Sequence, residues 1–149
     1  MKYYTDEIQA QIVIALLKKH GIRHVIASPG ATNMTFVASI QTDASFELYS
    51  AVDERSAAYM ACGLAAELDT PVALSCTGAT ASRNYMPGLT EAFYRKLPVL
   101  AITSTQNQAR IGNLIAQVID RSSSPKDVVK LSVDLPIVKD ADDVWECEM

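Results

Sequence analysis

One stretch of the chain, residues 50–68, consists almost entirely of small and helix-forming residues. Its charges are confined to the two ends, at residues 53–55 and at Glu67, and alanine is the commonest residue between them. Such a run predicts a long helix, and a helix that is apolar on nearly every face is typical of a buried one. A chain of 149 residues supplies only one layer of helices to each face of a sheet. We therefore expect a second subunit to complete the covering, which predicts a homodimer.

Length and composition exclude several classes of protein. Residues 1–149 fit a single domain, and 49% hydrophobic with 20% charged residues is typical of a globular chain. A net charge of −4 without a basic cluster argues against a nucleic-acid partner. No apolar run is long enough to span a bilayer. The N-terminus also lacks the basic segment followed by an apolar run that is typical of a signal peptide. We expect no membrane partner.

The cysteines and histidines show no metal-ligand spacing. Cys62, Cys76 and Cys147 are an odd number, and we interpret them as core thiols in a reducing, cytoplasmic compartment. His20 and His24 flank a turn without a third ligand nearby, which argues against a zinc site.

Strands and helices are expected to alternate along the chain. Strands are predicted at residues 22–27, 46–49, 72–76 and 97–103. Helices are predicted at residues 6–20, 33–40, 53–68, 85–94 and 141–149, with a short helix in the loop 104–113 and a strand or helix-to-strand passage at 127–135. The strand at 97–103 is nearly continuous in apolar residues, as expected of a strand buried on both faces of a parallel sheet. The alternation predicts an α/β fold in three layers, with a mostly parallel sheet between helices.

Breaks with small residues or a helix start follow the first three predicted strands. They are Ser28-Pro29-Gly30-Ala31, Asp53-Glu54 and Thr77-Gly78-Ala79. In an open α/β sheet ligands bind at the carboxyl ends of the strands, and small residues let the backbone approach a ligand. Singly, each break has an ordinary explanation, because Pro-Gly marks turns and acidic residues favour first helical turns. Glu54 is therefore either a helix-terminus charge or a functional carboxylate.

Together and in this order, the breaks resemble the pyrimidine-binding domain of thiamine-diphosphate-dependent enzymes. This family includes acetolactate synthase, benzoylformate decarboxylase and the menaquinone-pathway succinyl-cyclohexene-carboxylate synthase. The matching segments are residues 21–30, a strand ending in Pro-Gly; 53–58 with 63–65; 76–78; 88–92; 98–103; and 117–120. Asp53-Glu54-Arg55-Ser56 is most similar to the menaquinone-pathway synthase. The resemblance extends over roughly residues 5–138, and it implies the thiamine-diphosphate-binding fold.

The resemblance implies a role for Glu54. In the family, a glutamate at this position hydrogen-bonds N1′ of the aminopyrimidine ring and shares a proton with it. The imino tautomer that results places a nitrogen near thiazolium C2 to take its proton. A carboxyl suits this task because it can both donate to and accept from a ring nitrogen. Burial beside small apolar residues would raise the pKa of such a carboxyl, whereas a helix N-terminus and Arg55 would lower it.

The resemblance also implies which residues line the cofactor. The loop residues Pro29, Gly30, Ala31, Thr77, Gly78 and Ala79 would line the pyrimidine and the substrate side, and Gln117 would reach the same cleft. For Gln117, as for Asn33, a capping or surface role is an open alternative. The substrate class implied is a small 2-oxo acid, which is decarboxylated or ligated to an acceptor.

The chain departs from the family pattern in two places. The turn after the third strand, residues 77–84, lacks the proline and the second glycine of the family's Ser-Gly-Pro-Gly-Ala-Thr-Asn. The Gly-Asp-Gly motif that binds Mg²⁺ and the diphosphate is absent as well. We therefore expect Mg²⁺ and the diphosphate on a separate domain or subunit, and the present chain alone to be inactive. It would be a fragment of a longer enzyme or the pyrimidine-binding subunit of a split one, as in sulfopyruvate decarboxylase.

The sequence leaves one other class of protein open and disfavours a second. A non-catalytic dimerisation or binding module of the same fold would use the 53–68 helix only as an interface, with Glu54 as a terminus charge. A nucleotide-binding α/β domain is disfavoured, because no Gly-x-Gly-x-x-Gly follows the first strand.

Overall fold

Four parallel strands form the centre of the molecule. The computed structural model describes residues 4–121 and 123–149. The strands are β1 (His24–Ala27), β2 (Glu47–Ser50), β3 (Val72–Thr77) and β4 (Val99–Ser104), in the sheet order β2-β1-β3-β4. Ala27 pairs with both Ser50 and Ser75, and Thr77 pairs with Ser104. The carboxyl ends of all four strands therefore lie along one edge of the sheet.

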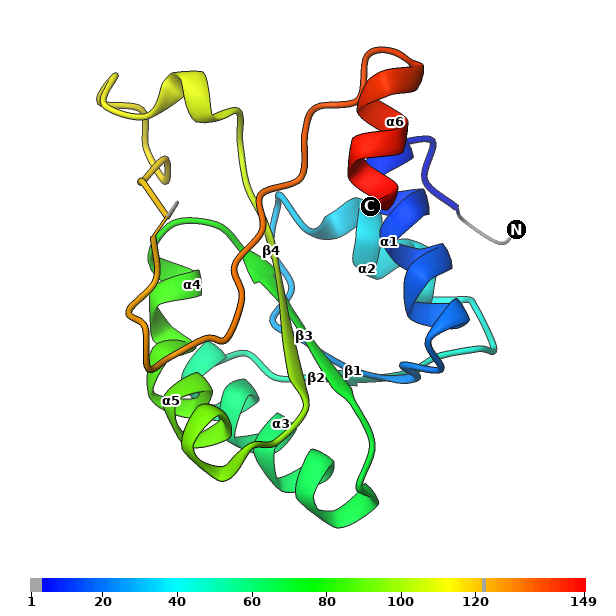
Figure 1. Cartoon of the computed structure of the whole chain (residues 1–149), viewed down its shortest axis with the longest axis vertical. Helices are drawn as coiled ribbons and strands as arrows, with labels where there is room; N and C mark the ends of the chain where they lie inside the picture. The colour runs from blue at the N-terminus through cyan, green and yellow to red at the C-terminus, as the bar shows by residue number, and fades with distance from the viewer. Residues whose placement is uncertain (1–3, 122) are drawn as a thin grey trace.

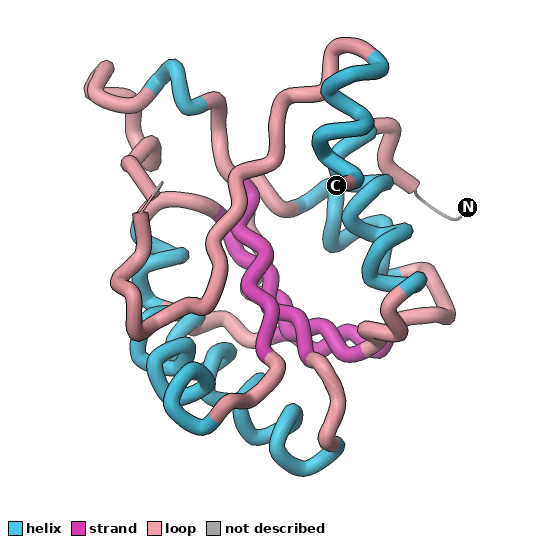
Figure 2. The backbone as a smooth tube through the Cα atoms, in the orientation of Figure 1, coloured by secondary structure: helices cyan, strands magenta, loops and turns pink. Residues whose placement is uncertain are grey.

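Helices cover both faces of this sheet (Figure 1). One layer consists of α1 (Ile8–Lys19) and α2 (Met34–Gln41), with α6 (Ala141–Glu148) beside α1. The other consists of α3 (Glu54–Leu68), α4 (Thr80–Asn84) and α5 (Met86–Arg95). Figure 2 shows the sheet between the two layers and the long irregular stretch that follows β4, which is interrupted by a 3-10 turn, η1 (Gln108–Arg110). The three-layer α/β prediction is confirmed.

Each layer buries its own apolar cluster. Between the sheet and α3, the cluster contains Ala57, Ala58, Ala61 and Ala65 together with Ile26, Leu74, Cys76 and Tyr85. Against the opposite face, it contains Ile14, Leu17, Phe36, Ile40 and Phe46 with Val25 and Ala73. Apolar side chains alternate between the two faces of β1 and β3, because successive residues of a strand point to opposite sides.

Helix α3 begins as the sequence predicts. Asp53 is its N-cap, and its carboxylate accepts hydrogen bonds from the Ser56 backbone N–H at 2.8 Å and the Ser56 hydroxyl at 2.6 Å. Within this chain the helix is buried along one stripe only, because Tyr59 and Met60 on the other side are 49% and 45% exposed. The cover by a second subunit stays a prediction.

The expectation for the fourth strand was wrong. It is an edge strand of the described sheet, next to β3 only, and its residues are half-buried rather than buried on both faces. Leu100 is 42% exposed. The apolar run identified a strand correctly, but the same run cannot tell how many neighbours the strand will have.

The segment 127–135 forms no strand, which corrects a second expectation. Leu131 and Val133 point outward and are 78% and 69% exposed. Their alternation resembles a strand pattern, but the segment makes no ladder with β4 and so crosses the molecule as irregular chain.

Two helix boundaries also differ. The first helix begins at Ile8, because the Thr5 hydroxyl accepts the backbone N–H of Glu7 instead of capping a first turn that contains Asp6 and Glu7. Residues 80–84, expected as loop, form the short helix α4.

The three cysteines are buried and unpaired, as predicted. Within the described residues, no three or more His, Cys, Asp or Glu side chains are grouped to hold a metal ion. None of the described helices has the length and apolarity that a bilayer crossing requires.

Candidate functional site

The loops after β1 and β3 are in direct contact at the carboxyl edge of the sheet. A Cβ atom at Gly30 would lie 2.2 Å from Cγ2 of Thr77, so any larger residue at position 30 would require the Thr77 side chain to move. The fully buried Asn33 fixes the loop, since its Oδ1 accepts the Gly30 backbone N–H at 2.8 Å. Its amide donates to Ser28 O at 3.2 Å and to Ser75 Oγ at 3.1 Å. Asn33 thus links β1 to β3, although it occupies the N-cap position of α2 without capping that helix by its side chain.

The loop after β4 joins the same place. The carbonyl of Ser104 accepts the Gly78 backbone N–H at 2.6 Å and the Thr32 hydroxyl at 2.8 Å. Ala79, which is buried, takes φ 60° and ψ −134° as the chain turns into α4. The loops after β1, β3 and β4 are therefore hydrogen-bonded around one carbonyl group.

Glu54 lies at the start of α3, at this edge of the sheet. Its side chain is half-buried, and its Oε2 accepts a hydrogen bond from Nδ2 of Asn84 at 3.3 Å. Its Oε1 accepts no hydrogen bond from the residues that the structure describes. One oxygen of the carboxylate is therefore held by α4, and the other is available to a ligand.

A buried polar group lies behind Glu54. Tyr85 is fully buried, and its hydroxyl lies beside the hydroxyl of Ser28 and the thiol of Cys76. Burial raises the pKa of the Cys76 thiol to about 11, and burial together with Cys76 raises the pKa of Tyr85. The charge of Glu54 also raises the pKa of both groups. Both side chains therefore stay protonated at neutral pH and act as neutral neighbours of the carboxyl group.

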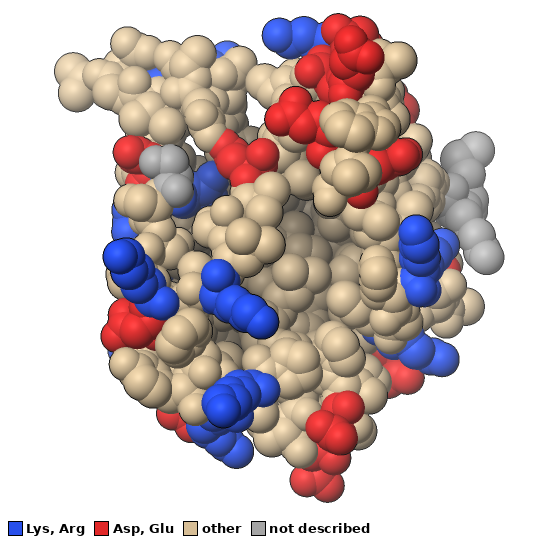
Figure 3. All heavy atoms as spheres, in the orientation of Figure 1, with Lys and Arg blue, Asp and Glu red and all other residues tan. Residues whose placement is uncertain are grey.

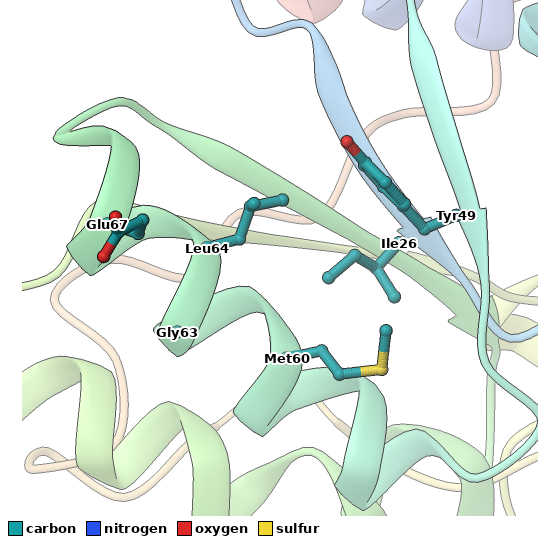
Figure 4. Close-up of a pocket in the computed structure, with 6 residues that line it drawn as sticks. All are labelled: Ile26, Tyr49, Met60, Gly63, Leu64 and Glu67. Carbon is teal, nitrogen blue, oxygen red and sulfur yellow. The ribbon is translucent and has the colours of Figure 1, made fainter.

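Two hollows flank the sheet. The smaller, about 360 Å³, lies between α3 and the edge formed by β2, where Ile26, Tyr49 and Met60 converge (Figure 4). The larger, about 1230 Å³, opens between α1, β4 and the segments 105–109 and 132–137. Figure 3 shows the surface hollowed on this side. Thr32, Ser104 and Arg121 line the larger groove, so it reaches the carboxyl edge of the sheet.

The structure brings most of the predicted site residues together and leaves one apart. Gly30 and Thr77 touch, Gly78 and Ala79 are buried beside them, and Pro29 and Ala31 are exposed on the first loop. Gln117 is exposed in the segment after η1, at φ 62°, and it is absent from the lining of the larger groove. Its role in the cleft stays a prediction.

The sequence alone does not single out Asn84 or Tyr85 as neighbours of Glu54. In the sequence, Asn84 is the last residue of the unusual turn 77–84, and Tyr85 is the start of a predicted helix. No spacing rule points to either residue, because each meets Glu54 or its neighbours through packing of α4 and α5 against α3.

Comparison with known proteins identifies the family. The sequence model of the "Thiamine pyrophosphate enzyme, N-terminal TPP binding domain" matches residues 9–124. The chain is 36% identical over 144 residues to 2-succinyl-5-enolpyruvyl-6-hydroxy-3-cyclohexene-1-carboxylate synthase of Bacteroides thetaiotaomicron, which covers 97% of the chain and 26% of the relative. It is 38% identical over 117 residues to the synthase of the same name from Desulfotalea psychrophila, covering 78% of the chain and 22% of the relative.

A solved structure shares the fold. Benzoylformate decarboxylase from Polynucleobacter necessarius superposes with a TM-score of 0.71 and 27% identity, over 82% of this chain and 23% of that one. The present chain thus spans about a quarter of the length of the curated relatives that it matches most fully. The chain belongs to the thiamine pyrophosphate (thiamine diphosphate) enzymes, and it corresponds to the N-terminal, pyrimidine-binding domain of that family.

Proposed function

We propose that this chain forms the pyrimidine-binding half of an active site that acts on a small 2-oxo acid, with Glu54 as the residue that activates the cofactor. The observation that carries the proposal is the state of the Glu54 carboxyl group. It is half-buried at the carboxyl edge of the sheet, with Oε2 held by Asn84 and Oε1 without a partner in the described chain. A carboxyl group presented in this way can bond one ring nitrogen.

The residues around Glu54 fit an aminopyrimidine ring. The edge is built from small side chains and close backbone, as at Gly30 and Thr77, so a flat ring can approach main-chain groups. The buried, uncharged side chains of Cys76 and Tyr85 lie close to Glu54. The cofactor, when bound, supplies an acidic carbon that adds to the 2-oxo group.

The chain's own residues then have distinct tasks. Glu54 holds a proton at the ring nitrogen and can take it back, because a carboxyl group both donates and accepts. Asn84 orients this carboxyl group through Oε2. The neutral Cys76 and Tyr85 keep the surroundings of Glu54 apolar and exclude water from its buried side.

The proposal extends to the diphosphate site, the reaction class, the compartment and the oligomeric state. Mg²⁺ and the diphosphate would be held by a domain or subunit that carries Gly-Asp-Gly, since this chain has no such motif. The enzyme would work in the cytoplasm as a decarboxylase or a carboligase. A homodimer is supported by the exposed side of α3, where Tyr59 and Met60 are about half exposed next to the apolar hollow of Figure 4.

The same exposed stripe also favours a second candidate, a non-catalytic dimerisation module. In that case α3 would serve only as an interface, and Glu54 would be a charge that complements the helix N-terminus. Both candidates predict self-association, so an oligomeric state does not separate them.

The deciding experiment concerns turnover. The chain is combined with a diphosphate-binding domain from a relative, thiamine diphosphate and Mg²⁺, and 2-oxo acid consumption is compared for wild type, Glu54→Gln and Glu148→Gln. We expect Glu54→Gln to lose about 10²-fold or more in kcat, the usual scale of a lost proton-transfer group. Glu148→Gln, at the exposed end of α6, should be unchanged. Equal turnover in Glu54→Gln and wild type would show that Glu54 does not activate the cofactor, and no turnover with either chain would favour the dimerisation module.

A further inference from the structure

The outer edge of β4 presents backbone groups that the sheet does not use. The carbonyls of Pro98 and Ser104 accept backbone N–H groups from β3 and from the turn after it, at 3.0 and 2.6 Å, so the even-numbered residues of β4 face β3. Successive residues of a strand direct their backbone groups to opposite sides, and Ala101 and Thr103 therefore direct theirs away from β3. Within residues 4–121 and 123–149, neither residue has a backbone hydrogen bond on that side.

The two edges of the sheet differ in how they are protected from further pairing. At the opposite edge, β2 has only four residues and includes Glu47, which lies 3.6 Å from the guanidinium group of Arg23. Short length and charged side chains are two devices that keep an edge strand from pairing with another chain. None of the six residues of β4 is charged or a proline. The composition of β4 therefore leaves its outer edge open to an additional strand.

The larger groove runs along this open edge (Figure 3). Val13, Leu16 and Phe36 line it from α1 and α2, and Leu135 and Ile137 line it from the segment that crosses the molecule. Its volume of about 1230 Å³ exceeds the range of about 300–1,000 Å³ that is usual for small-molecule sites. A long groove with apolar walls beside an unpaired strand fits an extended polypeptide better than a small ligand.

The charged side chains around the groove indicate what should flank such a polypeptide. Five carboxylates line the groove, against one arginine and one lysine, Arg121 and Lys139. Complementary charge favours encounter and fixes the register of a bound partner. A segment with an apolar centre and basic residues at its ends therefore complements both the walls and the charge of the groove.

We propose that the groove binds an extended, apolar polypeptide segment with basic flanks, which comes from outside residues 1–149 and adds to β4 as a fifth strand. Its backbone would bond to Ala101 and Thr103, and its side chains would cover Leu100, which is 42% exposed. Six residues at a rise of about 3.3 Å give a contact about 20 Å long. Relatives have polypeptide to supply such a strand, because this chain covers only 26% of the Bacteroides thetaiotaomicron synthase. The inference does not depend on Glu54 or on the cofactor.

The first test uses the full 149-residue chain and the synthetic peptide acetyl-Lys-Val-Thr-Val-Ile-Val-Thr-Lys-amide. Backbone amide signals are followed by NMR during titration. We expect saturable shifts and at least tenfold slower hydrogen exchange at Ala101 and Thr103, with no change along β2. Slow exchange at both amides without peptide would show that the chain itself or a second copy occupies the edge, and it would overturn the proposal. Equal changes along β2 would overturn it as well.

Altered peptides separate strand pairing from apolar binding and leave the protein unchanged. N-methylation of alternate residues removes either the N–H groups that face β4 or those that face away. We expect one of the two methylated peptides to bind at least tenfold more weakly than the other. Equal affinities would show that the groove takes up apolar material without forming a strand, which would overturn the proposal. A peptide with glutamate in place of both lysines should bind more weakly, and equal binding would contradict the basic flanks.

A matched pair of variants locates the peptide on the protein. Leu100→Lys places a cation on the groove side of β4, and it should weaken binding of the lysine-flanked peptide at least tenfold. Leu131→Lys is the control, because Leu131 is 78% exposed and lies outside the groove lining. Circular dichroism checks the fold of both variants, and if Leu100→Lys folds poorly, the two methylated peptides decide the question. Equal affinity of a folded Leu100→Lys and the wild type would refute binding at β4.

Discussion

The two helical layers of this domain pack against the same sheet in different ways. The layer of α1 and α2 uses large side chains such as Ile14, Phe36 and Ile40, each almost fully buried. The layer of α3 and α5 uses alanines and backbone. A Cβ at Gly88 would lie 2.4 Å from the Cβ of Ala58 and 2.9 Å from its carbonyl carbon. The first layer buries apolar area, whereas the second brings two helix backbones into contact.

The difference shows how the site is positioned. Contacts between backbones leave little freedom in the distance between α3 and α5, and the Cys62 thiol adds a hydrogen bond to Gly88 O at 3.2 Å. Because Tyr85 lies at the start of α5 and Glu54 at the start of α3, this contact sets the surroundings of the carboxyl group. The bulky side chains of one layer stabilise the fold by burying apolar area. The small side chains of the other layer fix the position of α3 relative to α5 at the sheet edge.

The largest expected effect is in the bulky layer. Ile14→Ala should lower the free energy of unfolding by about 2–5 kcal/mol, because it removes a fully buried side chain and leaves a cavity. Urea denaturation measures the change. Ile8→Ala on the same helix, where the side chain is 44% exposed, should change stability by less than about 0.5 kcal/mol. Equal effects at both positions would show that the α1 face is not packed as described.

Asn33 tests the connection between the bulky layer and the site. Asn33→Ala leaves the Gly30 N–H without its side-chain acceptor and removes two donated hydrogen bonds, so we expect a loss of about 1–3 kcal/mol. The exposed Asn113→Ala is the control. Hydrogen exchange should also accelerate at the Gly30 amide, and an unchanged exchange rate there would contradict the bridging role.

In the layer of α3 and α5, adding atoms is expected to destabilise the chain, whereas in the layer of α1 and α2 removing atoms does so. Gly88→Ala should destabilise by about 1–2 kcal/mol, because the new methyl group collides with Ala58 although alanine is the better helix former. Gly63→Ala in α3 has no atom within 4 Å of the added Cβ, and it should be neutral or stabilising by up to about 1 kcal/mol. If both substitutions stabilise the chain, the two helices are not in backbone contact.

The smallest effect is electrostatic and lies in the bulky layer. The hydrogen bond from Lys18, followed by that from the Ser45 backbone, lowers the pKa of Asp43 from 3.8 to about 2. A lowered folded-state pKa contributes stability above the unfolded value, and this contribution is lost as the pH falls from about 4 to about 2. For a partly exposed pair it should be less than about 1 kcal/mol. Asp43→Asn should remove this part of the acid dependence in urea titrations, and an unchanged pH profile would exclude the pair as its source.

The elements that were predicted correctly depend on neighbouring residues in the chain. The start of α3 after Asp53 follows from a capping carboxylate before a run of helix formers, and the end of α1 follows from Gly21, which has φ 67°. The fold class followed from the alternation of such elements. The family resemblance indicated Glu54 and the loop residues at 29–31 and 77–79, and the structure brings Gly30 and Thr77 into contact.

The expectations that failed concern neighbours in space. The apolar run at β4 was compatible with a central strand or an edge strand, and the alternation around Leu131 and Val133 was compatible with a strand that never finds a partner. The pattern of apolar side chains indicates which secondary structure a segment can form. Whether a strand-like segment pairs depends on whether another strand offers it an unpaired edge.

By itself, the sequence determined the order of strands and helices, the small-residue helix and the placement of an acidic residue at its start, because contiguous residues encode periodicity and caps. Only the tertiary structure decided which side of α3 stays exposed, that Asn84 binds Glu54, and that Nη1 of Arg121 lies next to Gly78. These contacts join residues far apart in the chain, so they depend on how the two layers close around the sheet rather than on any local pattern.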